Sequence, residues 1–273
     1  PDDNPHLGQL RHLESRMSDL AKFNDFDHGF LAKPQVEYYL LGQLPFDQCL
    51  ALQTRLAFRC GERVDGRISV ILCEHESLIS IGRRGSRAHI RLSEDQLRAR
   101  QIDTRWVGRG GGCVLHSPGQ LGLYVVAPLD RLGWSVGQFL QTMRRGLTAT
   151  MEEIQIPVQP KSDGGGVWGR TGLLAVTACA VRNWTTRYGM YVNVSPSMQH
   201  FGYVDTERGI EDESRGGMSC LLAERPQGVK MSEVRALLLE NLARSLGCAD
   251  YDVYNGHPWV TQSRKNSSGK NSA

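Results

Sequence analysis

Short strand-like segments interspersed with single helices are the feature that most limits the fold of this 273-residue chain. Residues 67–73, 173–182 and 189–194 are rich in β-branched and apolar side chains, as strands are. Residues 45–61 and 135–154 instead carry apolar side chains at helical spacing. Because strands occur in pairs and the helices singly, the pattern predicts an α+β (mixed α/β) domain with a mixed β-sheet rather than a regular βαβ array.

Other elements are expected along the same stretch. The expected strands cover residues 36–41, 78–81, 104–107, 122–128 and 167–168, and the expected helices cover residues 93–100 and the segments that begin at the N-caps Ser219 and Ser232. Only a polar turn separates residues 78–81 from the strand at 67–73, so the two are expected to be neighbours in one sheet.

The ends of the chain differ from its centre. Residues 1–35 are expected to form an N-terminal arm that is partly helical, because apolar residues recur at helical spacing over residues 7–23. Residues 257–273 are expected to be a disordered tail, since Ser, Lys, Asn and Gly dominate there. The sequence therefore predicts one domain over residues 36–256.

Composition limits the possible partners and the chemistry. A formal charge of +3 with 22% charged residues gives no indication of nucleic-acid binding. No apolar run is long enough for a signal peptide or a membrane span, so a soluble, cytoplasmic protein without a membrane partner is expected. The seven cysteines contain no CxxC pair, and His75 follows Cys73 with no second ligand pair in view. Neither a metal site nor any cofactor is therefore expected.

A glycine-rich run between two strands is the best functional signal. It reads Arg109-Gly110-Gly111-Gly112-Cys113-Val114-Leu115-His116-Ser117-Pro118-Gly119-Gln120. Successive glycines let backbone amides approach a ligand closely, and Arg109 adds a cationic fork, which together suit a carbonyl, carboxylate or phosphate. A tight turn between strands that needs positive φ angles is the alternative interpretation, and local chemistry leaves both open.

The same run resembles the signature of the lipoyl(octanoyl) transferases, in which Arg-Gly-Gly and three further residues precede His-x-Pro-Gly-Gln. Other motifs of that family recur in the same order. They are Glu74-His75 followed by Gly82-Arg83-Arg84, then Gly166-Val167-Trp168, then Tyr188-Gly189-Met190-Tyr191-Val192-Asn193-Val194 where the family has His-Gly-x-Ala-x-Asn-Val, and finally Met218-Ser219-Cys220-Leu221. The resemblance extends from about residue 36 to about residue 247.

The resemblance implies a single domain related to the biotin and lipoate ligases, with a mixed sheet, helices on one side and a tunnel for an eight-carbon chain. It also implies transfer of an octanoyl group, a medium-chain acyl group, from acyl carrier protein to a lysine of a lipoyl-domain protein. Carried over by position, the substrate-binding residues are Arg109, Gly110, Gly111, Gly112, Cys113, Val114, Leu115, His116, Val176, Thr177, Ala178, Gly189, Met190, Tyr191 and Arg83.

Two positions depart from the family pattern. The family uses a cysteine thiolate that accepts the acyl group and a lysine that lowers the pKa of that thiol. Counting without a gap from Asn193 places Glu207 at the cysteine position, and counting back from Gly189 places Leu173 at the lysine position. The resemblance thus predicts a retained pocket without the family's usual catalytic pair.

Three residues are candidates for the missing chemistry, each with an alternative. Glu207 is either a general base for direct transfer to a lysine or a surface glutamate in a charged loop. Cys220, near a predicted helix start that would stabilise a thiolate, is either a substitute nucleophile or a small core residue. His116 either orients a substrate or satisfies a backbone carbonyl.

Three functions follow from the residues and the resemblance. The first is an octanoyltransferase that acts by an altered mechanism. The second is an inactive protein that binds an acyl chain, acyl carrier protein or a lipoyl domain. The third is an ATP-dependent ligase of the lipoate or biotin type, whose relatives lack the covalent cysteine but rely on a lysine where this chain has Leu173.

Overall fold

The computed structural model describes residues 32–159, 166–205, 217–248 and 250–260. Glu207, the expected helix at 7–23 and the tail from residue 261 lie outside these ranges. The expectations for them therefore stay predictions.

The described chain alternates strands and helices as the sequence predicts. In order, the elements are β1 (Pro34–Gln43), α2 (Phe46–Glu62), β2 (Gly66–Glu74), β3 (Leu78–Ile81), the 3₁₀ turn Arg87–His89, α3 (Glu94–Ala99), β4 (Asp103–Trp106), β5 (Cys113–His116), β6 (Gln120–Val126), α4 (Leu129–Leu132), α5 (Val136–Glu153), β7 (Gly166–Trp168), β8 (Leu173–Arg182), β9 (Thr185–Asn193), the 3₁₀ turn Met198–Tyr203, α6 (Leu221–Glu224), α7 (Met231–Ser245) and β10 (Tyr251–Asn255).

The strands form two sheets. The larger has seven strands in the order β10-β1-β2-β6-β9-β8-β7, and the smaller has three in the order β4-β3-β5. β1 runs parallel to β2 and β10, whereas β6, β9, β8 and β7 pair antiparallel. The expectation of a mixed sheet in an α+β domain is confirmed.

The expected pairing of β3 with β2 is wrong. β3 pairs with β4 in parallel and with β5 antiparallel, and β2 pairs instead with β6. All four residues of β3 are buried, and Ile79 and Ile81 pack with residues of β5 in the apolar core of the small sheet. A sequence neighbour across a turn is the usual partner of a strand, but here the core of the small sheet decides the pairing.

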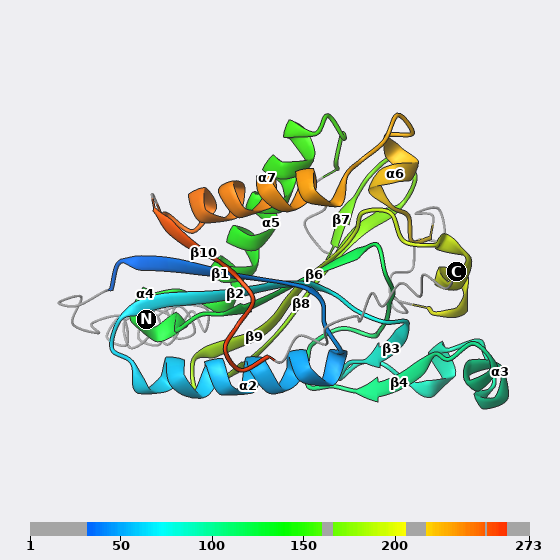
Figure 1. Ribbon diagram of the computed structural model, residues 1–273, viewed down its shortest axis with the longest axis horizontal. Helices are drawn as coiled ribbons and strands as arrows, with labels where there is room; N and C mark the ends of the chain where they lie inside the picture. Colours follow the sequence, from blue (N-terminus) through cyan, green and yellow to red (C-terminus); the bar gives the residue numbers. More distant parts are fainter. Residues whose placement is uncertain (1–31, 160–165, 206–216, 249, 261–273) are drawn as a thin grey trace, which may run out of the picture.

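Helices cover both faces of the large sheet, although the family resemblance implies only one. Alternate residues of β2 show the two faces, because Ile68, Val70 and Leu72 pack in the core with α5 and α7 whereas Ile71 and Cys73 pack with α2. Figure 1 shows the same layers, with α2 on one side of the sheet and α5 with α7 on the other. The face towards α2 is the one that carries the candidate site.

Two of the four serine caps are confirmed. Ser93 and Ser135 begin α3 and α5 with complete capping boxes. The other two predictions are wrong, since α6 has Cys220 as its N-cap and α7 has Lys230. Ser219 instead pairs its backbone N–H with the Leu173 carbonyl oxygen at 2.9 Å, so it belongs to the sheet edge rather than to the helix.

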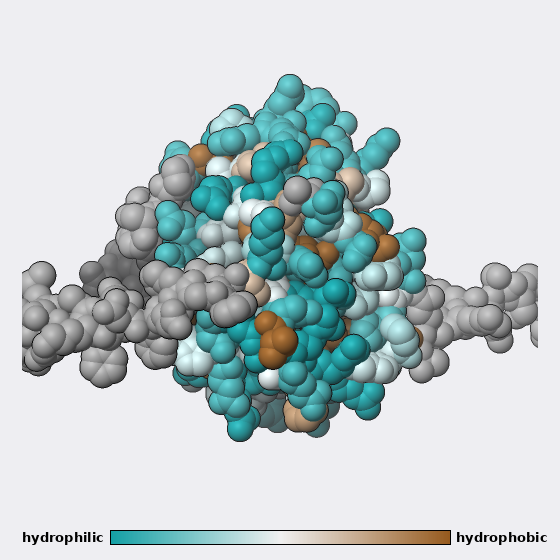
Figure 2. Space-filling model, turned by 90° about the vertical axis from the view of Figure 1, so that its left-hand side faces the viewer, coloured by the Kyte–Doolittle hydropathy of each residue, from teal (hydrophilic) through white to brown (hydrophobic). Residues whose placement is uncertain are grey.

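Some structure was not expected. β5 lies inside the glycine-rich run and β10 adds an edge strand next to β1. Residues 257–260, the start of the predicted tail, include a buried His257 whose ring lies 4.6 Å from that of Tyr39. The face shown in Figure 2 is mainly hydrophilic with scattered apolar residues. No helix among the described residues is long and apolar enough to cross a membrane.

Candidate functional site

The glycine-rich loop between β4 and β5 is fastened to the end of β3. The backbone N–H groups of Gly82, Arg83 and Arg84 each donate, at 3.0 Å, to a carbonyl oxygen of the loop. A Cβ at Gly82 would lie 2.6 Å from the Gly111 carbonyl oxygen, and Gly111 itself has a φ of +80°. The glycines are therefore required by close backbone contact and by a positive φ angle.

Arg109 is fully buried, and its guanidinium holds the loop together. Nη1 donates to the carbonyl oxygens of Gly110 and Gly112, at 3.0 and 2.9 Å, and Nη2 donates to the carbonyl and hydroxyl oxygens of Ser80. Its Nε is buried without a hydrogen-bond partner among the described residues. Four of the five N–H donors of this arginine thus shape the loop, and the buried Nε–H is left without a described hydrogen-bond partner.

A buried polar chain runs from Arg109 through His116. Ser80 Oγ lies 2.8 Å from His116 Nε2, and His116 Nδ1 lies 2.9 Å from the side-chain oxygen of Gln120. Gln120 in turn donates to Asn193 Oδ1 at 2.9 Å. Burial, together with electrostatic effects of the neighbouring His75 and Arg109, holds the pKa of His116 well below its usual value. His116 is therefore a neutral imidazole that links the two sheets.

Part of the predicted pocket converges on the α2 side of the large sheet. Val114, Val176 and Tyr191 share one apolar cluster with Leu173 and Trp168, and we call these five residues the acyl wall. The Tyr191 ring meets the edge of His116 at 4.6 Å and lies 6.0 Å from the Arg109 guanidinium. Burial raises the pKa of Tyr191 above its usual value, so its phenol stays neutral.

Ala178 and Gly189 lie beside the acyl wall. They are paired across β8 and β9, two positions along from the pair formed by Val176 and Tyr191, and strand alternation gives them the same face. A Cβ at Gly189 would lie 2.4 Å from the Leu123 carbonyl oxygen. Glycine is therefore needed for strand packing at this position.

Four other predicted pocket residues point elsewhere. Cys113 and Leu115 pack in the core of the small sheet, and the Cys113 thiol donates to the Ser86 carbonyl oxygen at 3.4 Å. Met190 packs in the core with α5 and α7, and Thr177 pairs directly opposite it. Because side chains alternate along a strand, these four cannot line the same surface as Tyr191.

Arg83 and Cys179 lie at the mouth of the glycine-rich loop. Arg83 is exposed, and its guanidinium approaches Gly110. The Gly110 N–H donates to the Cys179 carbonyl oxygen at 3.0 Å. Burial raises the pKa of the Cys179 thiol, and the charge of Arg83 opposes that effect only in part. Arg83 is thus an exposed cation next to the loop, whereas Cys179 is no ready thiolate.

Of the residues that the resemblance predicts at or near the family's catalytic positions, the structure describes only some. Leu173 is 2% exposed within the acyl wall, and its backbone pairs with the segment before α6 through Gly217 and Ser219. Cys220 is buried at the start of a four-residue helix, which is short for dipole stabilisation of a thiolate. Glu207 falls in the undescribed segment 206–216.

The structure adds buried polar residues that the sequence did not indicate. Cys49, from α2, lies next to Cys73 and His75, and Tyr124 lies 2.5 Å from His75 Nε2. Their rings and thiols form the layer beneath His116, whose ring centroid lies 5.8 Å from that of His75. Cys49 and Cys73 are far apart along the chain, so no spacing motif could reveal the group.

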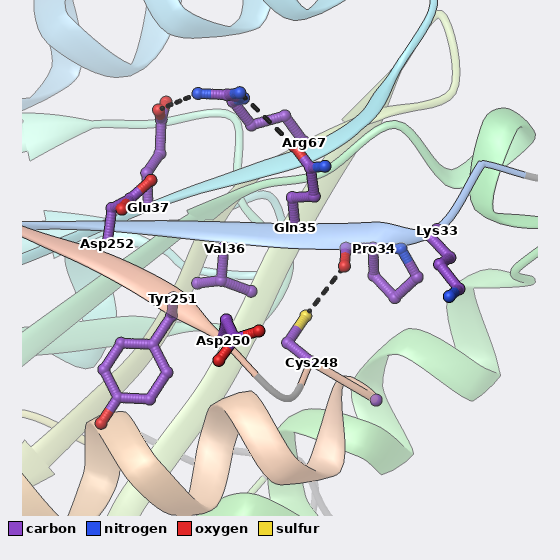
Figure 3. Close-up of a pocket in the computed structure, with 11 residues that line it drawn as sticks. Lys33, Pro34, Gln35, Val36, Glu37, Arg67, Cys248, Asp250, Tyr251 and Asp252 are labelled. Atoms are coloured by element: carbon purple, nitrogen blue, oxygen red, sulfur yellow. Dashed lines mark hydrogen bonds and ion pairs between the residues drawn. The ribbon is translucent and has the colours of Figure 1, made fainter.

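A separate cavity lies at the edge of the large sheet, away from the glycine-rich loop. It has a volume of about 470 Å³ and lies between β1, β2 and β10. Figure 3 shows Arg67 in it, already bonded to Glu37 and Gln35, and the Cys248 thiol donating to the Pro34 carbonyl oxygen. Among the described residues Arg67 Nε has no hydrogen-bond partner, as is the case for Arg109 Nε, but no residue of the glycine-rich loop lines this cavity.

Known proteins share the sequence and the fold. The lipoyl protein ligase A/B catalytic domain matches residues 45–243. An octanoyltransferase of Syntrophobacter fumaroxidans is 28% identical over 206 residues, covering 75% of this chain and 87% of the relative. One of Cytophaga hutchinsonii is 30% identical over 180 residues, covering 63% and 72%.

Solved structures agree on the fold. A bipartite lipoate protein ligase of Thermoplasma acidophilum superimposes with a TM-score of 0.65 at 16% identity, over 82% of this chain and 89% of the other. A lipoate-protein ligase A bound with ATP gives 0.67 at 15% identity, over 82% and 91%. Because the matched region runs from the start of α2 into α7 and contains the small sheet with five of the seven strands of the large one, this chain belongs to the lipoyl protein ligase A/B catalytic domain family.

Proposed function

We propose that this chain transfers an octanoyl group from acyl carrier protein to a lysine of a lipoyl-domain protein. The observation that carries the proposal is the acyl wall, where Val114, Val176 and Tyr191 meet beside a buried arginine with one unpaired donor. An apolar cluster of this kind suits a saturated chain, and the unpaired Arg109 Nε suits a thioester carbonyl. The octanoyltransferase relatives support the substrate class, and the lipoyl domain paired with the Thermoplasma ligase supports the acceptor.

The proposed transfer is direct and uses no acyl-enzyme. The lysine amine of the acceptor attacks the thioester carbon, so that a C–N bond forms and the C–S bond breaks. Glu207 takes the proton that the amine loses, and the departing thiolate of the carrier takes up a proton from solvent. A positioned base contributes about 10²- to 10⁴-fold to such a step. Arg83, exposed beside Gly110, would attract the phosphate of the carrier's prosthetic arm.

One observation favours recognition without catalysis as the second candidate. Leu173 is buried in the acyl wall, so no ammonium group arises from the position at which the resemblance predicts the family's lysine. A protein of this kind would keep the acyl chain or the lipoyl domain bound without turnover. Its natural partners would be the same as those of the enzyme.

The decisive experiment incubates the full chain with octanoyl-acyl carrier protein and an apo lipoyl domain, with and without ATP, and follows the acceptor by intact mass. Octanoylation without ATP supports direct transfer. Octanoylation only with ATP would assign a ligase, and binding of either partner without any acylation would assign the recognition protein.

Two variants then test the proposed chemistry. Glu207→Gln should lower the transfer rate by about 10²- to 10⁴-fold, since it removes the base, while Glu62→Gln, at the exposed end of α2, should leave the rate unchanged. Full activity of Glu207→Gln would refute the base assignment. Cys220→Ser should retain activity, and its loss together with an acyl adduct on wild-type Cys220 would make that thiol the nucleophile.

A further inference from the structure

We propose that Cys49, Cys73 and His75 bind a zinc ion between α2 and β2, with the hydroxyl of Tyr124 at the fourth position. One ligand atom from each of the three side chains lies within 4.8 Å of the others, and all three residues are buried. This site is distinct from the proposed acyl-transfer chemistry and lies beneath it. It also departs from the expectation of no metal, because the third ligand comes from a helix that the sequence did not connect to the other two.

The spacing of the ligand atoms fits tetrahedral zinc. Zn–S bonds of about 2.3 Å and Zn–N bonds of about 2.0 to 2.1 Å place two sulfurs about 3.8 Å apart and a sulfur about 3.6 Å from a nitrogen. In the structure, the two thiols are 4.0 Å apart and the Cys73 sulfur is 3.6 Å from His75 Nε2. The Cys49 sulfur and the His75 nitrogen lie within 4.8 Å of each other, so side-chain shifts of at most about 1 Å would close the ligands on a metal.

The histidine is oriented as metal ligands usually are. His75 Nδ1 lies 2.7 Å from the Leu44 carbonyl oxygen, so this nitrogen carries the proton and donates it. That contact leaves Nε2 facing the sulfurs and the Tyr124 hydroxyl. A hydrogen bond from the other ring nitrogen to a backbone carbonyl fixes the tautomer that a zinc-bound imidazole requires.

The sulfurs also lie in surroundings that suit thiolates. The side-chain amide of Gln53 approaches the Cys49 sulfur at 3.6 Å, and its oxygen accepts from the Tyr188 N–H, which fixes the amide. A divalent cation bound between the two sulfurs would deprotonate both thiols.

Tyr124 completes a closed site. In the structure its hydroxyl donates to His75 Nε2 at 2.5 Å. Zinc would replace this hydrogen bond, and the oxygen and nitrogen would then lie about 3.3 Å apart. All four side chains are almost fully buried, which excludes an open, solvent-filled coordination position. The arrangement therefore corresponds to a structural zinc site, in which metal binding contributes to folding.

The metal would stabilise the layer under the candidate site. It would link α2 to β2 through Cys49 and Cys73, and the ring of His75 packs edge-on against His116. Tyr124 packs against Tyr191 of the acyl wall at 5.8 Å. Loss of zinc should thus loosen both the attachment of α2 and the tyrosine layer.

The test measures zinc in the full chain. Because the site is enclosed, the protein is unfolded with reductant, refolded with or without Zn²⁺, freed of loose metal by a weak chelator, and analysed by elemental mass spectrometry. Refolding with Co²⁺ gives a second readout, since tetrahedral thiolate ligation produces visible d–d bands. Cys60→Ser is the matched control for Cys49→Ser, because Cys60 is a buried cysteine of the same helix whose neighbours are Arg131 and Thr185.

We expect equimolar zinc in the wild type and in Cys60→Ser, and loss of both zinc and the cobalt spectrum in Cys49→Ser. Wild-type protein refolded with zinc should also have a higher unfolding midpoint than wild-type protein refolded without it. A wild-type protein that refolds without retaining metal overturns the proposal, whether or not any variant folds. Zinc retained by Cys49→Ser at the wild-type level, or a Cys49–Cys73 disulfide in place of metal, overturns it as well.

Discussion

Replacing Leu173 by lysine tests directly whether the family's lysine position has become part of an apolar core. The wild-type side chain is 2% exposed and packs with Val176, Tyr191 and Trp168. A lysine there keeps much of the apolar contact through its methylene groups, but its amine has to be buried. Burial strongly disfavours the charged form, so the folded variant holds a neutral amine with a pKa far below its usual value.

The magnitude follows from the protonation difference. An unfolded lysine has a pKa of about 10.4, so at pH 7 neutralising it costs about 1.4 kcal/mol for each of roughly 3.4 pH units, or about 4 to 5 kcal/mol. The folded pKa is lowered, so the unfolded state binds the extra proton and stability rises with pH. Between pH 7 and pH 9 the destabilisation should therefore shrink by about 2.7 kcal/mol.

Urea unfolding at the two pH values, read by circular dichroism, measures both numbers against the wild type. Leu173→Met is the matched control, since a volume-conserving change in a core costs less than about 1.5 kcal/mol and should show no additional pH dependence. A Leu173→Lys variant that loses less than about 1 kcal/mol at both pH values would refute the reasoning. Such a result would mean that the position reaches solvent or a carboxylate, and that a lysine there is compatible with catalysis.

Three further predictions concern the same layer. Because the pKa of His116 is lowered in the folded state, the unfolded state binds more protons below about pH 6.5. Acidification from pH 7 to pH 5.5 should therefore lower the free energy of unfolding by about 1 kcal/mol more in the wild type than in His116→Gln, as measured by urea unfolding. Gly189→Ala should lower the free energy of unfolding by about 1 to 3 kcal/mol, since its Cβ would meet the Leu123 carbonyl oxygen at 2.4 Å. Gly202→Ala is the control, because the space around Gly202 is open, and it should be close to neutral in the same assay. Tyr191→Phe should change the unfolding free energy by less than about 1 kcal/mol, because the hydroxyl has no hydrogen-bond partner of ordinary geometry. Tyr191→Ala should lose about 3 to 5 kcal/mol, because it removes the buried ring. Equal losses in the two variants would contradict this account of the hydroxyl.

Local signals in the sequence predicted most of the elements. The capping boxes of Ser93 and Ser135 fix helix starts through neighbouring residues alone, so sequence suffices to find them. The predictions that Ser219 and Ser232 cap helices were wrong. For Ser219 the reason is a contact with a residue distant in sequence. Whether Ser219 caps a helix depends on Leu173, far away in the chain, which takes the Ser219 N–H into the sheet edge.

The candidate site was predictable as a motif but not as a geometry. The glycine-rich run identified the loop, yet its composition could not show that Arg109 would turn inward onto Ser80. Strand alternation separates Cys113 from Val114 only once β5 is recognised as a strand. The contact between Cys49 and Cys73 depends on how α2 packs, which no spacing in the sequence encodes.

The departures from the family pattern form a connected change. By the family resemblance, Leu173 stands where the family has a lysine and Tyr191 where it has an alanine. Both side chains belong to the same buried cluster. A lysine next to a fully buried tyrosine would have neither solvent nor an anion to support its charge. With the Tyr191 ring in this cluster, an apolar side chain at position 173 is more stable there than a lysine. Without the lysine ammonium, a cysteine at position 207 would lack the charge that lowers the pKa of its thiol. The three substitutions are thus expected to depend on one another, so a single reversion such as Leu173→Lys should destabilise the fold without restoring covalent chemistry.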